Sequence, residues 1–202
     1  MPTEPATPTP GSAADAPLRL AVLVGSNREG RFGPTVAAWF ATQAAARPDV
    51  VLDVVDLAEV PLPWVYPAGP NDDVAAWQAR LAAADAVVIV TPEYNHSFPG
   101  PLKHALDLAG RTLAGKPVGF VSYGGLSGGL RAVEALRVVI AELHAMSVRD
   151  TVSFHTAWER FDAEGAPHDA AATAGAAKVL LDQLHWWGRA LRAARAQQPY
   201  GS

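Results

Sequence analysis

Residues Thr91 to Asp107 read TPEYNHSFPGPLKHALD, and this stretch indicates the fold of the whole chain. It follows the apolar run Ala86–Val90, whose β-branched residues are typical of a buried parallel strand. A compact polar loop and a Pro-Gly-Pro sequence come next, and then apolar residues at the spacing of a helix. Ligands of open α/β sheets bind at the carboxyl ends of such strands. We therefore expect the loop at Pro92–Asn95 to contact a flat polar ligand.

A second loop of the same kind follows the apolar run Leu18–Val24. It reads Gly-Ser-Asn-Arg-Glu-Gly-Arg and ends shortly before Pro34, which fits the first turn of a helix. The loop offers the hydroxyl of Ser26, the guanidiniums of Arg28 and Arg31, and the free N–H groups of a helix start. These are the groups that bind a phosphate. The spacing is neither that of a P-loop nor that of the dinucleotide fingerprint.

The third loop follows the short apolar run Val118–Val121. It reads SYGGLSGG over residues 122–129, and its four glycines allow the backbone to come close to a ligand. Ser122, Gly124 and Gly125 stand nearest the end of the strand. An amphipathic helix follows, so this segment repeats the order of strand, loop and helix.

The remaining apolar runs complete an alternation of strands and helices. Strands are predicted at 18–24, 51–56, 86–91, 116–122 and 148–152, and helices at 34–46, 73–83, 100–109, 128–143 and 169–194. This alternation predicts an α/β protein with a parallel sheet covered by helices on both faces. For five strands we favour the flavodoxin-like order 2-1-3-4-5, a three-layer sandwich. Its switch point lies between the first and third strands, where the first two loops would meet.

The chain of 202 residues has the size of one domain, or of one domain with a tail. Residues 1–17 are rich in proline, threonine and alanine and carry almost no large apolar side chain. They cannot bury enough surface to offset the entropy of ordering, so we expect a disordered tail. The folded domain is predicted to span residues 18–196, with a short C-terminal tail at 197–202.

Composition excludes several classes of function. The chain has no cysteine, which excludes disulfides, thiolate nucleophiles, iron–sulfur clusters and cysteine-ligated zinc. The formal net charge is −4 at pH 7, so nucleic acid is not an expected partner. No apolar run approaches the roughly 20 residues of a membrane helix, and the first residues lack the pattern of a secretory signal. We expect a cytoplasmic protein.

Taken together, the three loops resemble the NAD(P)H-dependent FMN reductase family, flavodoxin-like enzymes that include quinone, azo-dye and chromate reductases. The resemblance rests on GSxR at residues 25–28, on PEYN with SxPGxLKxAxD within residues 92–107, and on Gly124–Gly125 after the fourth strand. It covers about residues 18–152, and the PEYN segment is its most specific part. His104 stands where the family usually has asparagine.

The resemblance implies a non-covalently bound FMN, with NADPH or NADH as co-substrate. In the family, the first loop holds the FMN phosphate, the second contacts the isoalloxazine and the third packs beside the flavin ring. The cofactor-binding residues that the resemblance implies are Ser26, Arg28, Arg31, Pro92, Glu93, Tyr94, Asn95, Ser122, Gly124 and Gly125. Because the flavin carries the chemistry, no catalytic side chain is expected. The six histidines show no metal-ligand spacing, so no metal site is expected.

Some residues of the PEYN segment also have a structural interpretation. The carboxylate of Glu93 is expected to shape the loop rather than to bind the ligand. Tyr94 either packs against the flavin ring or lines the substrate pocket. Asn95 either bonds to the flavin or stabilises the turn. His96 and His104 flank the segment, and we favour packing over proton donation for both, because a reduced flavin needs no side-chain acid.

The C-terminal third of the chain carries aromatic and basic residues that we interpret as structural. Trp158, Trp186 and Trp187 are expected to be core or interface residues rather than ligand-stacking ones. The arginines near the end of the last helix suit the helix dipole and need no partner.

The expected function is reduction of a quinone, an azo compound, a metal oxyanion or free flavin by NAD(P)H through bound FMN, in a ping-pong sequence. NADPH is favoured over NADH. The alternative is a flavodoxin-type FMN electron carrier without nicotinamide turnover. Carriers are typically strongly acidic, because they dock on basic partners, whereas this chain is only mildly acidic. A third and weaker alternative is an FMN-binding regulatory or stress protein. The family resemblance implies a homodimer or a homotetramer.

Overall fold

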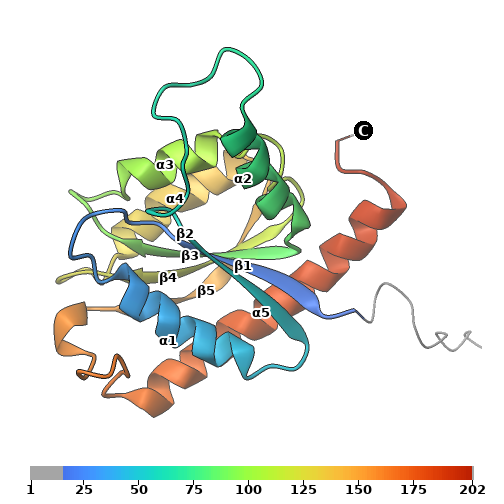
Figure 1. The fold of residues 1–202 in the computed structure, drawn as a ribbon. Helices are drawn as coiled ribbons and strands as arrows, with labels where there is room; N and C mark the ends of the chain where they lie inside the picture. The colour runs from blue at the N-terminus through green and yellow to red at the C-terminus, as the bar shows by residue number, and fades with distance from the viewer. Residues whose placement is uncertain (1–15, 202) are drawn as a thin grey trace, which may run out of the picture.

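Five strands form one parallel sheet in the computed structural model, which describes residues 16–201 (Figure 1). The strands are β1 (Leu18–Val24), β2 (Val50–Asp56), β3 (Ala86–Pro92), β4 (Pro117–Tyr123) and β5 (Met146–Phe154). Their order is β2-β1-β3-β4-β5. The predicted flavodoxin-like topology is therefore confirmed. Residues 1–15 of the predicted N-terminal tail lie outside the described residues.

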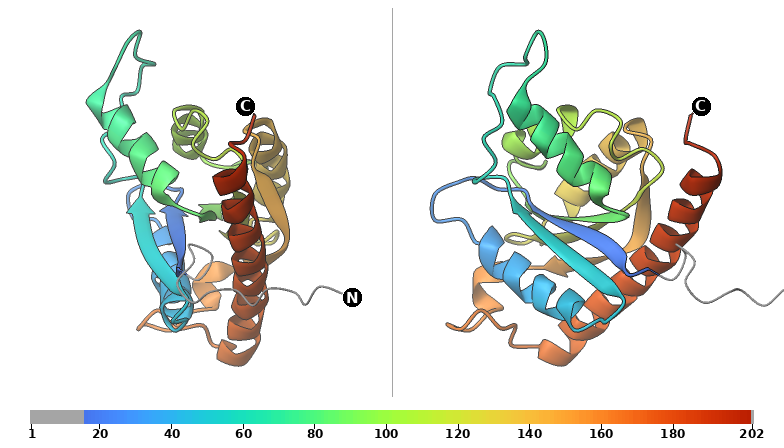
Figure 2. Two further views of the ribbon diagram at one scale, coloured as in Figure 1. Left: turned by 90° about the vertical axis from the view of Figure 1, so that its right-hand side faces the viewer. Right: turned by 45° about the vertical axis from the view of Figure 1, so that its right-hand side comes forward.

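Helices cover both faces of the sheet. One face carries α1 (Gly33–Ala45) and α5 (Ala170–Gln197); the other carries α2 (Asp72–Ala83), α3 (Gly100–Asp107) and α4 (Leu130–Glu142) (Figures 1 and 2). Successive side chains of a strand point to opposite faces. In β1, Leu20 and Val22 pack toward α1 and α5, whereas Ala21 and Leu23 pack toward α2 and α3. This burial on two sides explains why the inner strands are apolar without alternation.

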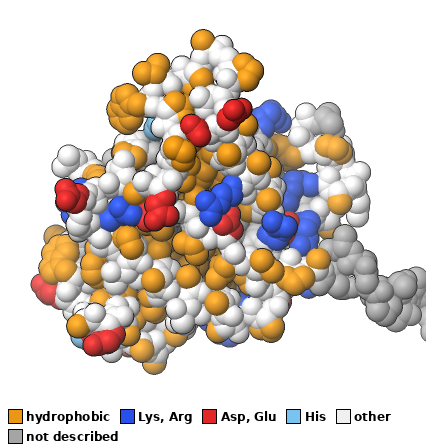
Figure 3. Space-filling model, in the orientation of Figure 1, with side chains coloured by type: hydrophobic (Ala, Val, Ile, Leu, Met, Phe, Trp, Pro, Cys, Tyr) orange, Lys and Arg blue, Asp and Glu red, His pale blue; other side chains and the backbone are white. Residues whose placement is uncertain are grey.

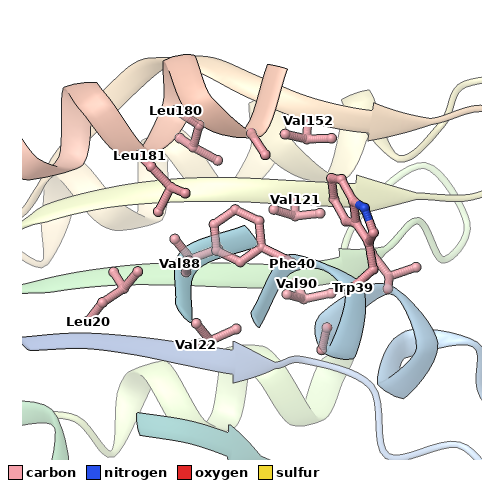
Figure 4. Packing of buried hydrophobic residues seen from close by; sticks show 14 of the residues in the cluster. Leu20, Val22, Trp39, Phe40, Val88, Val90, Val121, Val152, Leu180 and Leu181 are labelled. Atoms are coloured by element: carbon pink, nitrogen blue, oxygen red, sulfur yellow. The ribbon is translucent and has the colours of Figure 1, made fainter. Parts of the chain in front are cut away.

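The core between the sheet and α1 is built around Phe40. This residue is fully buried, and Figure 4 shows its ring among the valines of the sheet and near Leu181 of α5. Trp39 beside it meets Phe154 edge to face, with the ring centroids 5.0 Å apart. A helix from the start of the chain and a helix from its end thus share one core.

The end of α5 is fixed to the amino end of the sheet by charged side chains. Arg192 donates to the carboxylate of Asp85 at 2.9 Å, and Arg195 donates to the carbonyl of Gly115. Asp85 also accepts the backbone N–H of Arg19 at 3.0 Å. The prediction that these arginines need no partner was therefore wrong. Helix α5 crosses the sheet and brings Arg192 and Arg195 to the amino ends of β3 and β4.

Most element boundaries differ from the sequence prediction by one to three residues, and the differences are largest at β5 and at the last helix. β5 begins at Met146 and runs to Phe154, with a register shift against β4 between Val118 and Phe120. The last helix ends at Gln197 rather than at residue 194. None of the helices within residues 16–201 is both long enough and apolar enough to cross a membrane.

Close packing of α5 on the sheet depends on glycine. A Cβ at Gly188 would lie 2.6 Å from a methyl carbon of Leu18, and one at Gly119 in β4 would lie 2.7 Å from a methyl carbon of Leu180. Larger residues at these positions would push the helix away from the strands. Gly175, near the start of the same helix, is exposed and has open space around it.

Gly188→Val is expected to lower the free energy of unfolding by about 1–3 kcal/mol, because the added methyl groups overpack a filled core. Gly175→Val is the matched control. It should leave stability unchanged or raise it slightly, since valine has a higher helix propensity than glycine. Urea unfolding of both variants measures the difference. Equal effects at the two positions would contradict the packing of α5 described here.

Candidate functional site

Four loops meet at the carboxyl ends of the strands, on the left-hand side of the view in Figure 1. They follow β1, β3, β4 and β5, and together they line a cavity of about 220 Å³. The predicted cofactor residues that line it are Arg28, Arg31, Pro92, Glu93, Tyr94, Gly124 and Gly125. The other three, Ser26, Asn95 and Ser122, lie close by but do not line the cavity.

The loop after β1 is fixed against the loop after β3. The N–H of Gly25 donates to the carbonyl of Val90 at 2.8 Å. A Cβ at Gly25 would lie 2.9 Å from a methyl carbon of Leu102, so the approach of the two segments requires glycine. Ser26 is fully buried, and its hydroxyl lies 2.7 Å from the hydroxyl of Tyr94. The geometry gives Ser26 a role in holding Tyr94 at the cavity wall.

The PEYN segment ends in a tight hairpin turn. Tyr94 and Ser97 exchange two backbone hydrogen bonds of 2.9 and 3.0 Å. Asn95 and His96 occupy the two central positions with φ angles of 48° and 69°, as a type I′ turn requires. Both are exposed. Asparagine is among the residues that adopt this conformation most readily, which supports the turn-forming role for Asn95.

Glu93 joins the loop after β3 to the start of α4. Its carboxylate accepts hydrogen bonds from the hydroxyl of Ser127, from the backbone N–H of Arg131 at 3.2 Å and from the Arg131 guanidinium at 2.8 Å. Burial alone would raise the pKa of Glu93, but these hydrogen bonds outweigh it and hold the pKa below its ordinary value. The carboxylate is therefore ionised at neutral pH, and its hydrogen bonds are made to residues of its own chain. This agrees with the loop-shaping role.

Glu93→Gln is expected to destabilise the protein by on the order of 1.5–3 kcal/mol at pH 7, the scale of hydrogen bonds to a charged group. A lowered pKa in the folded state stabilises above the unfolded pKa, and this contribution disappears as the pH falls through the folded pKa. The difference in unfolding free energy between Glu93→Gln and wild type should therefore have its full value above about pH 4.5 and decrease below that pH. Thermal unfolding from pH 3 to 7 measures it, with Glu134→Gln as a largely exposed control. A pH-independent difference would contradict this assignment.

Ser122 supports the glycine loop from below. It is fully buried, and its hydroxyl donates to the carbonyl of Gly128 at 2.8 Å. A Cβ at Gly129 would lie 2.8 Å from the Cβ of Ser122, so the loop lies directly on this side chain. Gly124, at the other end of the loop, donates to the carbonyl of Phe154 at 3.1 Å. The bare backbone of Gly124–Gly125 is left to form part of the cavity wall.

Two buried polar groups beside the cavity have no partner. Among residues 16–201, the buried side-chain nitrogen and oxygen atoms without a hydrogen bond are Arg31 Nε and Tyr123 Oη. Arg31 forms an ion pair with Asp56 at the end of β2, which uses only its terminal nitrogen. Burial raises the pKa of Tyr123 well above its ordinary value and outweighs Arg28, Arg31 and Ser26 nearby, which lower it, so its hydroxyl remains a donor. The Ser26 hydroxyl is itself bonded to Tyr94. Because an unmade buried hydrogen bond costs about 1–3 kcal/mol, these groups indicate a ligand with strong acceptors.

The same end of the cavity has positive electrostatic character. The Tyr123 oxygen lies 2.8 Å from the position of a Cβ at Gly33, so the hydroxyl is at the start of α1. A helix start presents free N–H groups and the positive end of the dipole. Arg28 adds a guanidinium, which lies 5.8 Å from the centre of the Tyr94 ring. This arrangement fits a phosphate group.

Sequence reasoning missed four residues of the cavity wall, namely Phe32, Tyr123, Ala157 and Trp158. For Tyr123 a signal was available, because it stands between two predicted residues at the end of a buried strand. Trp158 comes from the short 3-10 helix η1 (Ala157–Glu159) between β5 and α5, where no motif marks it. Of the two roles predicted for it, core or interface, the core role is wrong, since 63% of the residue is exposed; the interface role stays a prediction. Trp186, 64% exposed, does not belong to the core either.

His104 lies outside this cavity and fastens the proline-rich loop at residues 57–71 to α3. Its Nε2 is 2.7 Å from the carbonyl oxygen of Pro63. The rings of Trp64 and Tyr66 flank it, with centroids at 5.6 and 5.7 Å. Hydrophobic side chains gather on this protruding loop at the top of Figure 3. The packing role favoured for His104 thus has a structural basis.

Sequence comparison matches most of the chain to a known family. A sequence model of the family described as NADPH-dependent FMN reductase matches residues 18–159. A quinone reductase of Escherichia coli (strain K12) is 39% identical over 140 residues, which are 64% of this chain and 72% of that protein. An NAD(P)H-dependent FMN reductase of Schizosaccharomyces pombe is 35% identical over 120 residues. That match covers 55% of this chain and only 60% of the yeast protein.

The fold is shared with solved structures. The flavoenzyme NAD(P)H:(acceptor) oxidoreductase FerB of Paracoccus denitrificans superimposes with a TM-score of 0.69 at 24% sequence identity. The superposition covers 86% of this chain and 98% of FerB. This structural likeness supports the fold alone. Membership of the family rests on the sequence match to residues 18–159.

Proposed function

The chain belongs to the NADPH-dependent FMN reductase family, and we propose that it uses NAD(P)H to reduce a small-molecule acceptor through a non-covalently bound FMN. The observation that carries the proposal is the convergence of unpartnered donors at the start of α1. Arg31 Nε and the Tyr123 hydroxyl are buried and unsatisfied, and the Arg28 guanidinium lies beside them in the cavity wall. Such a site fits the phosphate of FMN, whose oxygens accept several hydrogen bonds at once.

The remaining wall of the cavity suits the flat part of a flavin. Tyr94 presents an aromatic ring, and Gly124–Gly125 present backbone without side chains. FMN, when bound, supplies the ring that accepts a hydride and passes electrons on. The residues of the chain bind and orient this group. Glu93 is held as a carboxylate by its neighbours, and Tyr123 retains its proton, so neither is suited to exchange protons during turnover near neutral pH.

A quinone is the acceptor that the relatives support best. Besides the Escherichia coli quinone reductase, a 2-hydroxy-1,4-benzoquinone reductase of a Burkholderia species is 37% identical over 134 residues. Azo compounds, metal oxyanions and free flavin are further acceptors within the proposal. We also propose that nicotinamide and acceptor use the same cavity in turn, a ping-pong order, with NADPH favoured over NADH. The homodimeric or homotetrameric state and the cytoplasmic location stay predictions.

Anaerobic reduction of the flavin-loaded protein tests this function against its rival. NADPH should bleach the visible flavin absorbance, and a quinone such as menadione should restore it. Steady-state rates with a quinone, an azo dye and free FMN would then rank the acceptors. A protein that binds FMN but is reduced by neither NADPH nor NADH would be the electron carrier instead. If the protein takes up no flavin, both the reductase and the electron-carrier functions are excluded.

Arg28→Ala is expected to weaken FMN binding by about 1.5–3 kcal/mol, the scale of a charge-assisted hydrogen bond. Affinity for riboflavin, which has no phosphate, should hardly change. Tyr123→Phe should weaken FMN binding less, and it should stabilise the flavin-free protein because an unsatisfied buried hydroxyl is removed. Titration of each apo-variant with both flavins measures these effects. Arg149→Ala, which removes an exposed guanidinium, is the control. An equal loss for FMN and riboflavin would argue against the phosphate assignment.

A further inference from the structure

Trp158 is the largest side chain in the wall of the cavity, and its own chain leaves most of it uncovered. It comes from η1, and 63% of the residue is exposed. The Cη2 atom of its indole lies 3.6 Å from the position of a Cβ at Gly125. The ring therefore lies over the glycine backbone after β4, at the mouth of the cavity.

The backbone beneath Trp158 is firmly held in place. The N–H of Thr156 donates to the carbonyl of Gly125 at 2.9 Å, and the N–H of Ala157 donates to that of Gly124 at 3.0 Å. Thr156 has a φ of 45° and a ψ of 52°, a left-handed conformation that β-branched residues rarely adopt. Such conformations persist where surrounding structure imposes them, and they cluster at ligand clamps and active sites. The indole is thus positioned by the fold.

Other exposed tryptophans have ring partners. Trp186 is 64% exposed, but its ring meets Trp187 edge to face at 4.7 Å on α5. Trp64 packs against His104. The Trp158 ring, in contrast, meets no other aromatic ring among residues 16–201. A large aromatic surface left open beside a cavity is a feature of ligand-binding sites.

We propose that the Trp158 indole covers the flavin nucleotide in this cavity and slows its release. The inference rests on the function proposed above, because FMN is the ligand that it names. Arg28 and Tyr123 offer polar contacts to the phosphate, whereas Trp158 offers an apolar surface that loses its contact only when the ligand leaves. Differences of this kind act mainly on the dissociation rate. The sequence match to the family ends at residue 159, so Trp158 stands at its very edge.

Hydroxyl-radical footprinting of the wild-type protein tests the contact directly. The protein is oxidised with FMN bound and again after its removal, and the extent of oxidation of each tryptophan is read by mass spectrometry. Oxidation of Trp158 should fall at least about threefold when FMN is bound, because the ring becomes covered. Trp186, which is about equally exposed on α5 and does not line the cavity, is the control in the same molecule and should not change. Equal oxidation of Trp158 in the two states would overturn the proposal.

Variants test the consequence for binding. Trp158→Ala should weaken FMN affinity about tenfold, chiefly through faster dissociation, and Trp158→Phe should keep it within about threefold of wild type. Trp186→Ala should leave it unchanged. Circular dichroism of each variant checks the fold. If FMN dissociates from Trp158→Ala at the wild-type rate, this inference alone is overturned, since the protein would still bind FMN. A wild-type protein that binds no FMN would overturn both this inference and the proposed function.

Discussion

The site depends on the close approach of β1 and β3 at their carboxyl ends. Gly25 bonds to the carbonyl of Val90 and leaves no space for a side chain against Leu102. The loop after β1 is thereby brought against the PEYN segment, and the hydroxyls of Ser26 and Tyr94 meet. Without this contact, the basic loop and the aromatic wall would not belong to one cavity.

Polar side chains of the chain are used in two ways around this contact. Glu93, Ser122 and Ser26 bond to their own chain and hold the loops in place. Arg31 Nε and the Tyr123 hydroxyl are kept out of such bonds although they are buried. The division explains how a set of loops can be rigid and still hold donors in reserve for a ligand. Preorganised donors need no rearrangement at the moment of binding.

The opposite end of the sheet is held by charged hydrogen bonds and by close packing of α5. There Arg192 and Arg195 of α5 meet Asp85 and the carbonyl of Gly115, far from the cavity along the strands. The helix is also packed against the sheet through Gly188.

The sequence by itself determined the strand runs and the three loops that form most of the cavity, whereas the strand order was one favoured topology for five strands that the structure confirmed. The runs and the loops follow from local patterns, since apolar runs, glycines and the PEYN segment act on their immediate neighbours. The tertiary structure alone decided which side chains remain unpartnered and which distant ones join them. Tyr123 is unsatisfied only because β4 carries it against the start of α1. Trp158 reaches the cavity only because the segment after β5 bonds to Gly124 and Gly125, more than 30 residues earlier in the chain. Such contacts depend on how surfaces meet after folding, and no local pattern encodes them.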